Sequence, residues 1–332
     1  MLYAGVDLHR RFLVVAVEDE RGEVKHQERF ECREAGRIRE FFSSLGVFRA
    51  VIESSSSYRW LYDLLSEYGQ VVLAHPYRLR AIVAGRAKTD KLDAAMLAGL
   101  LRVDMIPESY VPPVDYQALR DLARNRARLV GEGTGAKNEL HALLGRANRH
   151  SPYRNAFCQR GRHWIGALDW SPVYRDAAGE LLRRLAHFEA EVRLVDERLE
   201  ELAGHFPEVE ALTCLYGVGR YSALLIVAEL GEPWRFRGSR QVGAYAGLTA
   251  RVSQSGERAR YGSISRQGSK WLRWILVEAA MKLVRQDRQL GNFYRRIRKR
   301  SGARVARVAA ARKLAEICWK RLMRWHRERG AA

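Results

Sequence analysis

Four carboxylates in the first hundred residues have the types and the spacing of a divalent-metal site. Asp7 ends the apolar run at the start of the chain, and Glu53 ends a second apolar run that begins at Phe48. Asp90 and Asp93 are three residues apart, which places both side chains on one face of a helix. Carboxylate oxygens are the ligands that Mg²⁺ and Mn²⁺ prefer, and two such ions stabilise the attacking and leaving oxygens of a phosphoryl transfer. The four acids together therefore predict metal-dependent cleavage of a phosphodiester.

Each acid alone also has an ordinary structural explanation. An aspartate after a strand is often a turn residue, and Asp90 with Asp93 is also the pattern of a helix N-cap and its partner. The occurrence of all four acids in suitable elements, within a basic chain, favours catalysis. His9 follows Asp7 by two residues and would face the same side of an extended strand, either as a metal ligand or as a residue at the rim.

The elements that must position these acids alternate between strands and helices. Short apolar segments predict strands, and longer amphipathic segments predict helices. In chain order the predicted elements are strands at 3–6, 12–17 and 24–30, a helix at 34–45, a strand at 49–52, a helix at 58–68, a strand at 71–74 and a helix at 90–103. This ribonuclease-H-like order predicts an α/β domain over residues 1–106, with a mixed sheet flanked by helices.

A helical linker is predicted over residues 107–207, beginning with a proline-rich stretch at 107–113. The glycine-rich segment 131–135 is expected to interrupt one of its helices. This segment is not a phosphate-binding loop, because it lacks a glycine before Lys137, a serine or threonine after it, and a preceding strand.

Within this linker, a heptad seam about three repeats long predicts a coiled coil over residues 181–202. The seam consists of Leu181, Leu185, Phe188, Val192, Val195, Leu199 and Leu202. It could pair within the chain or with another protomer. The dense charge at the outer positions favours a contact between protomers.

Residues 208–332 are predicted to form a third, mainly helical domain. A tight turn at Gly217-Val-Gly219 lies between two helix-like segments. This is the pattern of a helix-hairpin-helix, whose backbone N–H groups can hold a DNA phosphate, and equally the pattern of a plain corner between helices.

The positive charge of the chain is concentrated near its C-terminal end. The formal net charge is +20, and residues 251–332 contain 23 lysines and arginines against five acids, a net of +18. Tryptophans are interleaved among these cations. A basic block of this size favours a polyanion, because each neutralised phosphate releases a counterion, and it predicts a nucleic-acid partner. Arg86 and Lys88, just before the Asp90–Asp93 pair, would lie near the scissile phosphate.

Other classes of protein are disfavoured by composition. No apolar run reaches the roughly 18 to 20 residues needed to span a bilayer, and the first residues lack the pattern of a signal peptide. The cysteines have neither zinc-site spacing nor a disulfide framework. We therefore expect a cytoplasmic protein without a membrane partner. The cysteines are Cys32, Cys158, Cys214 and Cys318.

Several segments, taken together and in order, resemble the DEDD-type insertion-sequence transposases, the family of bridge-RNA-guided serine recombinases. In the first half these are Gly5-Val-Asp7-Leu-His9, Val51-Ile-Glu53 and Lys88-Thr-Asp90-Lys-Leu-Asp93. In the second half they are the segments 215–219, 245–249, 253–256 and 262–273. The resemblance covers nearly the whole chain.

The resemblance implies a RuvC-like N-terminal domain that holds Mg²⁺ (or Mn²⁺) on the four acids. It also implies a helical coiled-coil linker and a C-terminal transposase domain, residues 208–332, that contributes a nucleophilic serine. Carried over to this chain, that serine is Ser255, with Ser253 as the alternative two residues away. The resemblance further implies a dimer or tetramer that acts on DNA with a structured guide RNA. Cations suited to phosphate contact near the serine are Arg258, Arg266, Lys270 and Arg273.

The expected function is therefore DNA strand cleavage and exchange through a covalent Ser255–phosphate intermediate, with Mg²⁺ on the acids. Two alternatives remain from the residues alone. A metal-dependent endonuclease of the Holliday-junction type would use water and form no adduct. A non-catalytic nucleic-acid-binding protein would need none of the acids.

Overall fold

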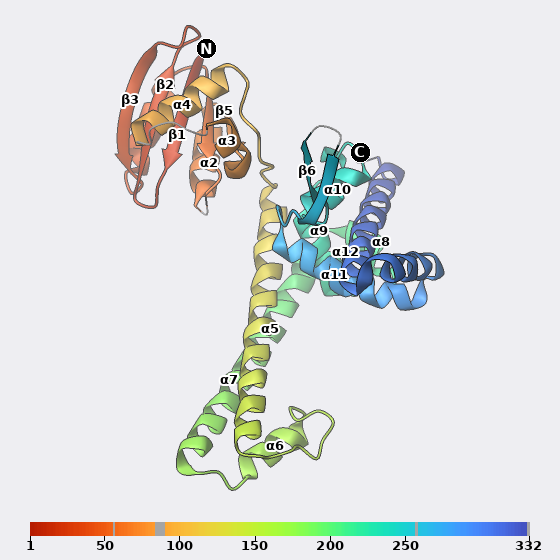
Figure 1. Cartoon of the computed structure of the whole chain (residues 1–332). Coiled ribbons are helices and arrows are strands. Elements are labelled where there is room, and N and C mark those ends of the chain that lie inside the picture. The colour runs from red at the N-terminus through yellow and green to blue at the C-terminus, as the bar shows by residue number, and fades with distance from the viewer. Residues whose placement is uncertain (56, 84–89, 256–257, 331–332) are drawn as a thin grey trace. The chain divides into compact units, whose positions relative to one another are not determined.

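The computed structural model describes residues 1–55, 57–83, 90–255 and 258–330, and it divides the chain into two compact units. The N-terminal unit is Met1–Val111, and the C-terminal unit is Pro112–Ala332. Each unit is built around its own core, so each is described separately (Figure 1).

A five-stranded mixed sheet forms the centre of the N-terminal unit, with the strand order β3-β2-β1-β4-β5. The first three strands are antiparallel neighbours, whereas β4 and β5 run parallel to β1. The strands are β1 Leu2–Leu8, β2 Phe12–Glu18, β3 Val24–Glu31, β4 Phe48–Glu53 and β5 Gln70–Ala74. The ribonuclease-H-like mixed sheet expected from the element order is confirmed.

Helices cover both faces of this sheet, which explains why its central strands are apolar over most of their length. On one face, α1 and α2 bury aromatic and aliphatic residues such as Phe42 and Leu61. On the other face, α4 buries Leu97 and Leu101 together with Leu79 of α3, a short helix absent from the predicted elements. The helices are α1 Ala35–Ser44, α2 Tyr58–Ser66, α3 Pro76–Ile82 and α4 Asp90–Arg102.

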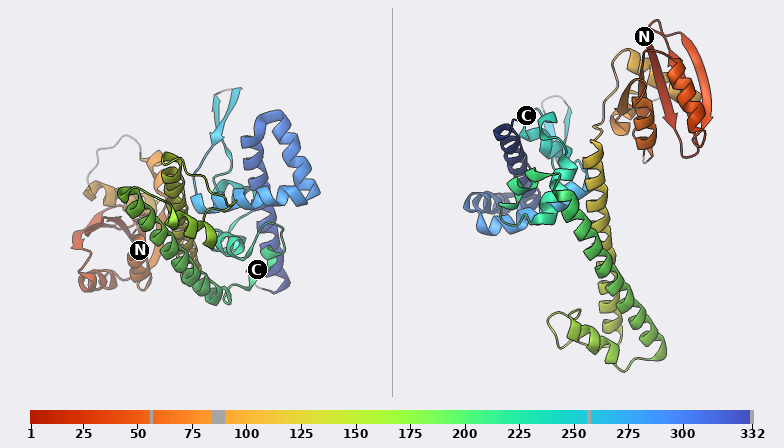
Figure 2. Two further views of the ribbon diagram at one scale, coloured as in Figure 1. Left: turned by 90° about the horizontal axis from the view of Figure 1, so that it is seen from below. Right: turned by 180° about the vertical axis from the view of Figure 1, so that it is seen from behind.

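The C-terminal unit begins with two long helices that lie side by side, α5 Val114–Arg146 and α7 Pro172–Ala203, with α6 Gln159–Ala167 packed at their far end (Figures 1 and 2). The expected interruption of α5 at residues 131–135 is wrong, because the helix is continuous there. A glycine in a helix interior costs about 1 kcal/mol relative to alanine. A Cβ at Gly133 would lie at ordinary van der Waals distance from Phe188 and Leu185 of α7, 3.7 and 3.8 Å, so α5 runs through this segment in contact with α7.

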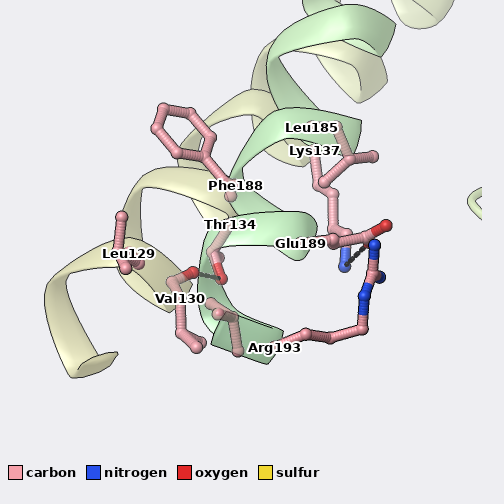
Figure 3. Close-up of a pocket in the computed structure, with 10 residues that line it drawn as sticks. Leu129, Val130, Thr134, Lys137, Leu185, Phe188, Glu189 and Arg193 are labelled. Carbon is pink, nitrogen blue, oxygen red and sulfur yellow. Dashed lines mark hydrogen bonds and ion pairs between the residues drawn. The ribbon is translucent and has the colours of Figure 1, made fainter. Parts of the chain in front are cut away.

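The predicted heptad seam on α7 packs within the chain. Leu181, Leu185, Val195 and Leu199 are buried, and α5 is the neighbouring helix along most of this length. These four residues are therefore buried by packing within the chain, and not by the expected contact with another protomer. Phe188 and Val192 of the seam are half-buried and line a shallow groove between the two helices, and Figure 3 shows Phe188 at its edge.

Buried charges tie α5 to the helix α9 Arg220–Leu230 at the centre of the C-terminal core. Glu229 is 1% exposed and accepts hydrogen bonds from Arg124, at 2.6 Å from Nε and 3.0 Å from Nη2. Arg120 donates to the carbonyl oxygen of Ala228 at 3.0 Å. Because a buried carboxylate needs a partner, this pair fixes the long helices to the core.

The remaining elements surround α9, whose residues from Ala223 to Leu230 are all buried. Gly217 adopts a φ of 82°, and a Cβ there would lie 2.6 Å from Cβ of Lys282, so this turn packs directly on α11. A β-hairpin, absent from the predicted elements, precedes the last two helices. These elements are α8 Glu210–Thr213, α10 Ser239–Tyr245, β6 Ala250–Ser255, β7 Arg258–Ile264, α11 Lys270–Gln286 and α12 Arg288–Glu328, with short 3-10 turns at Pro207–Val209 and Pro233–Arg235.

In the described part of the chain, no helix combines the length and the apolar character required to cross a bilayer.

Candidate active site

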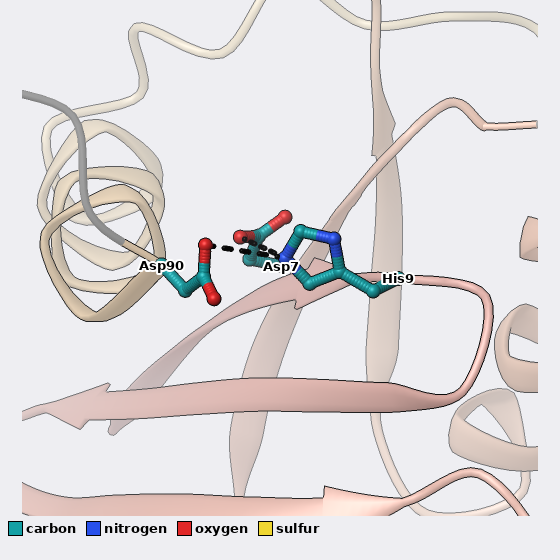
Figure 4. Close-up of side chains that lie close together, drawn as sticks. All are labelled: Asp7, His9 and Asp90. Carbon is teal, nitrogen blue, oxygen red and sulfur yellow. Dashed lines mark hydrogen bonds and ion pairs between the residues drawn. The ribbon is translucent and has the colours of Figure 1, made fainter.

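Three of the side chains considered from the sequence meet at one edge of the N-terminal sheet (Figure 4). Asp7 lies near the end of β1, His9 follows the strand, and Asp90 is the first residue of α4. Nε2 of His9 lies 3.1 Å from Oδ2 of Asp7 and 3.4 Å from Oδ1 of Asp90. One ligand atom from each residue lies within 4.8 Å of the others, a geometry that can hold a divalent cation.

The placement of Asp90 above Asp7 depends on Gly5. A Cβ at this position would lie 2.0 Å from the carbonyl oxygen of Ala94 and 2.4 Å from the backbone nitrogen of Ala98. Because glycine has no side chain, α4 can pack directly on β1 two residues before Asp7. The first turn of α4, with Asp90, then reaches the end of the strand.

The pKa of Asp7 reflects the other negative charges close to it. Burial raises the pKa of Asp7 above its ordinary value, His9 opposes this shift, and the nearby charges of Asp90 and Asp93 raise the pKa further. A divalent cation relieves this repulsion and stabilises the charged carboxylates. The residues present therefore fit a divalent metal ion.

Glu53 is placed by the register of the sheet. It ends β4, the parallel neighbour of β1, and Val6 pairs with Ile52 one residue earlier. Val51 packs against the α4 side of the sheet, and side chains alternate along a strand, so Glu53 faces the same side. Asp93 lies in the first turn of α4, close enough for its charge to affect Asp7.

From the sequence, His9 could be either a metal ligand or a residue at the rim of the site. In the structure its ring lies between Asp7 and Asp90. The two-residue spacing from Asp7 was the available signal. Arg86 and Lys88, expected near the scissile phosphate, lie outside the described residues.

The expected nucleophile belongs to the β6–β7 hairpin of the C-terminal unit. Ser255 is the last residue of β6 and pairs with Arg258, the first residue of β7. The side chains of residues 252–261, which include Ser253, Ser255 and Arg258, lie outside the described part of the structure. Only the backbone position of the serine is therefore given, at the end of the hairpin away from its base.

The base of this hairpin is tightly packed. Gly268 has a φ of 107°, and a Cβ there would lie 1.9 Å from the carbonyl oxygen of Tyr245. Arg273 donates from Nη1 to the carbonyl oxygens of Ala246 at 3.2 Å and Arg266 at 3.4 Å, and burial lowers its pKa. The guanidinium of Arg273 is thus engaged with the backbone at the hairpin base.

The other cations expected to contact phosphate at the hairpin base are more accessible. Arg266 and Lys270 are exposed, and Nζ of Lys270 lies 4.9 Å from the ring centroid of Trp271. Both side chains are therefore accessible to solvent at the hairpin base, and their contact with phosphate stays a prediction.

A ribonuclease-H-like sheet with acids at its strand ends, followed by a helical unit, defines a DEDD transposase. Comparison with known families supports this class. A transposase family with the DEDD domain of IS110 elements matches residues 4–148, and the family described as "Transposase IS116/IS110/IS902 family" matches residues 209–295. The chain belongs to the IS110 family of transposases, enzymes that cleave and transfer DNA strands.

Individual relatives agree over almost the full length. The chain is 28% identical to a probable family 20 transposase of Pseudomonas aeruginosa, over 91% of this chain and 92% of that protein. It is also 28% identical to the transposase for insertion sequence element IS1328 of Yersinia enterocolitica, over 95% of both chains. The expected transposase is confirmed, and the DEDD domain implies a divalent metal ion and a DNA substrate.

Proposed function

We propose that this transposase exchanges DNA strands through a covalent Ser255–phosphate intermediate. In this proposal, Asp7, Glu53, Asp90 and Asp93 hold Mg²⁺ (or Mn²⁺). Metal binding is supported by the positions of Asp7, His9 and Asp90, since one possible ligand atom from each lies within 4.8 Å of the others. The enzyme would act on donor and target DNA in the cytoplasm.

Each residue of the acidic site has a distinct task in this proposal. The side chain of Asp7 is 15% exposed against 48% for Asp90, so Asp7 supplies the less accessible carboxylate of these two. Because an ionised carboxylate only accepts hydrogen bonds, Nε2 of His9 would donate to Oδ2 of Asp7 at 3.1 Å and so orient this one carboxylate. A bound metal ion would supply charge stabilisation to the phosphate under attack.

The covalent step conserves the energy of the phosphodiester. The Oγ–P bond forms as the serine hydroxyl loses its proton, and the bond from phosphorus to the leaving DNA oxygen breaks as that oxygen gains a proton. Attack by the hydroxyl of another strand reverses these changes and releases the serine. The position of Ser255 at the end of a β-hairpin, within the matched residues 209–295, supports this role.

Trapping of the adduct tests the nucleophile. Wild-type protein, Ser255→Ala and Ser253→Ala are each incubated with Mg²⁺ and nicked DNA, and covalent protein–DNA species are resolved under denaturing conditions. We expect adduct from wild type and Ser253→Ala and none from Ser255→Ala. Adduct at the wild-type level from Ser255→Ala would refute the proposal. Cleavage by wild type without any adduct would show that water is the nucleophile.

We also propose that a structured guide RNA directs the enzyme and that it works as a dimer or tetramer. The net charge of +18 over residues 251–332 supports an RNA partner besides DNA. The half-buried Phe188 and the exposed Leu194 on α7 support a contact between protomers. Sequencing of copurified nucleic acid and a native mass measurement test the two parts; unrelated RNA fragments or a monomer on DNA would refute them.

A further inference from the structure

The surface around Gly302, where α12 bends, is purely cationic. Gly302 has φ 82° and ψ 168°, a conformation that ends one helical segment and begins the next. Between residues 288 and 315 the chain has ten lysines and arginines and no aspartate or glutamate. We call the exposed cations nearest the bend the Gly302 corner; they are Arg298, Lys299, Arg300, Arg304 and Arg307.

These cations have no acidic partner among the residues that the structure describes. Cations that face α7 differ, because Arg126 of α5 pairs with Asp196 at 2.9 Å and Arg162 of α6 pairs with Glu189 at 2.6 Å. Where cations and acids alternate, their charges largely cancel. At the Gly302 corner, positive charges from two helical segments lie together without acids to neutralise them.

The corner is held in place by the apolar side of α12. Ala306 and Ala310 are fully buried in the core that α12 forms with α9 and α11, so the cations of the second segment must point outward. Val305 is the one large hydrophobic side chain of the described residues 295–307 that is exposed, at 52%. A membrane-binding helix needs an exposed apolar face, which this segment has instead buried.

We propose that the Gly302 corner binds the phosphate backbone of duplex DNA, independently of base sequence. The corner lies outside both matched ranges, residues 4–148 and 209–295. The first backbone N–H groups of the segment after Gly302 add partial positive charge beside Arg304. The proposal rests on DNA being the substrate of the family, and it does not depend on Ser255 as the nucleophile.

The salt dependence of binding measures such contacts directly. Each phosphate neutralised on B-DNA contributes about 0.9 to the slope of log affinity against log salt concentration. Replacement of Arg298, Lys299 and Arg300 by glutamine therefore lowers the slope by up to about 2.7, if each contacts one phosphate. A matched triple variant on α7, Arg183→Gln, Arg193→Gln and Arg198→Gln, removes the same net charge from exposed positions on a surface of mixed sign.

The experiment titrates a short mixed-sequence DNA duplex with the full-length chain at several salt concentrations. For the corner variant, we expect the slope of log affinity against log salt concentration to fall by about two or more. For the α7 variant, we expect this slope to change by less than about 0.5. Equal slopes for the two variants would refute the proposal. Loss of slope with an RNA duplex alone, and not with DNA, would refute the choice of DNA.

A second variant keeps the proposal testable if the first is unstable. Arg304→Gln with Arg307→Gln changes the other helical segment, and a slope loss of up to about 1.8 is expected. Substitution of Arg298 and Arg300 by lysine should retain the slope, because charge alone suffices for backbone contact. Ser255→Ala should bind with the wild-type slope, so failure of the nucleophile and failure of this surface are distinguishable.

Discussion

The two units divide charge and chemistry between them. The N-terminal unit, residues 1–111, has 16 lysines and arginines and 16 acids, so its formal net charge is zero. The C-terminal unit contains the other 42 cations and 22 acids and therefore the whole excess of +20. The neutral unit gathers acids at the end of a sheet, while the basic unit exposes cations on helices.

This difference follows from what each architecture can hold. Parallel strands end at one edge of a sheet, so acids such as Asp7 and Glu53 can be brought together over a short distance. Long helices with one buried side leave the opposite side exposed over many turns, which suits repeated contacts to a polyanion. We infer that the N-terminal unit supplies the metal site and the C-terminal unit supplies most of the affinity for DNA.

The largest expected effect comes from Asp7→Asn. Loss of a carboxylate from the metal site should reduce DNA cleavage by more than about a hundredfold. DNA affinity should change by less than about twofold, because the cations of the C-terminal unit are intact. Single-turnover cleavage and equilibrium binding on one duplex give the two values.

Asp63→Asn is the matched control. Asp63 is an exposed acid of the same unit, paired with Arg59 at 2.8 Å on α2, and its replacement should leave both cleavage and binding unchanged. Equal cleavage rates for Asp7→Asn and Asp63→Asn would contradict the inference that the N-terminal unit supplies the metal site.

A second, smaller effect is expected from Gly5→Ala. The added methyl group meets the backbone of α4 at Ala94 and must displace the helix. Overpacking of this kind costs about 1–3 kcal/mol of unfolding free energy, and the shift of Asp90 should also weaken metal binding. Denaturant unfolding and a metal titration of cleavage measure the two consequences.

Gly36→Ala provides the comparison for this substitution. Gly36 lies in α1 with nothing within 4 Å of an added Cβ, so alanine should be neutral or stabilise by up to about 1 kcal/mol. If both variants keep the wild-type stability and metal dependence, close packing of α4 on β1 does not position the site.

The smallest expected effect concerns pH and the C-terminal unit. His326 is 6% exposed between Trp234 and Trp325, and neither ring nitrogen has a hydrogen-bond partner in the described part of the chain. Burial lowers its pKa below 6.5, with Glu208 opposing. The unfolded chain therefore binds the proton more readily, and the stability of the unit falls as the pH drops below about 6.5.

His326→Phe keeps the aromatic contacts and removes the titrating group. It should reduce the loss of stability as the pH falls below about 6.5, and it should raise stability at pH 7 by about 1 kcal/mol, since a buried unsatisfied polar group is removed. Thermal unfolding against pH measures both. His187→Phe, at an exposed position on α7, should leave the dependence of stability on pH unchanged. If His326→Phe also leaves it unchanged, His326 is not the group responsible.

Local patterns were sufficient for most of the N-terminal unit. The predicted strands and helices up to Arg102 each correspond to an observed element, because apolar runs and amphipathic periods of this kind act over a few residues. The same patterns failed at residues 131–135, where glycine propensity predicted a break and the helix α5 is continuous. They also missed the β6–β7 hairpin, whose short polar strands have no clear apolar alternation.

The sequence by itself determined the class of enzyme, the acids and the location of the positive charge, because residue types, spacing and net charge are properties of the chain alone. Tertiary structure decided which of these residues meet. Packing of α4 on Gly5 brought Asp90 to Asp7, and His9 joined them. Packing also buried the heptad seam against α5 and directed the cations beside Gly302 outward, since long-range contacts, rather than local preference, determine which side of a helix is covered.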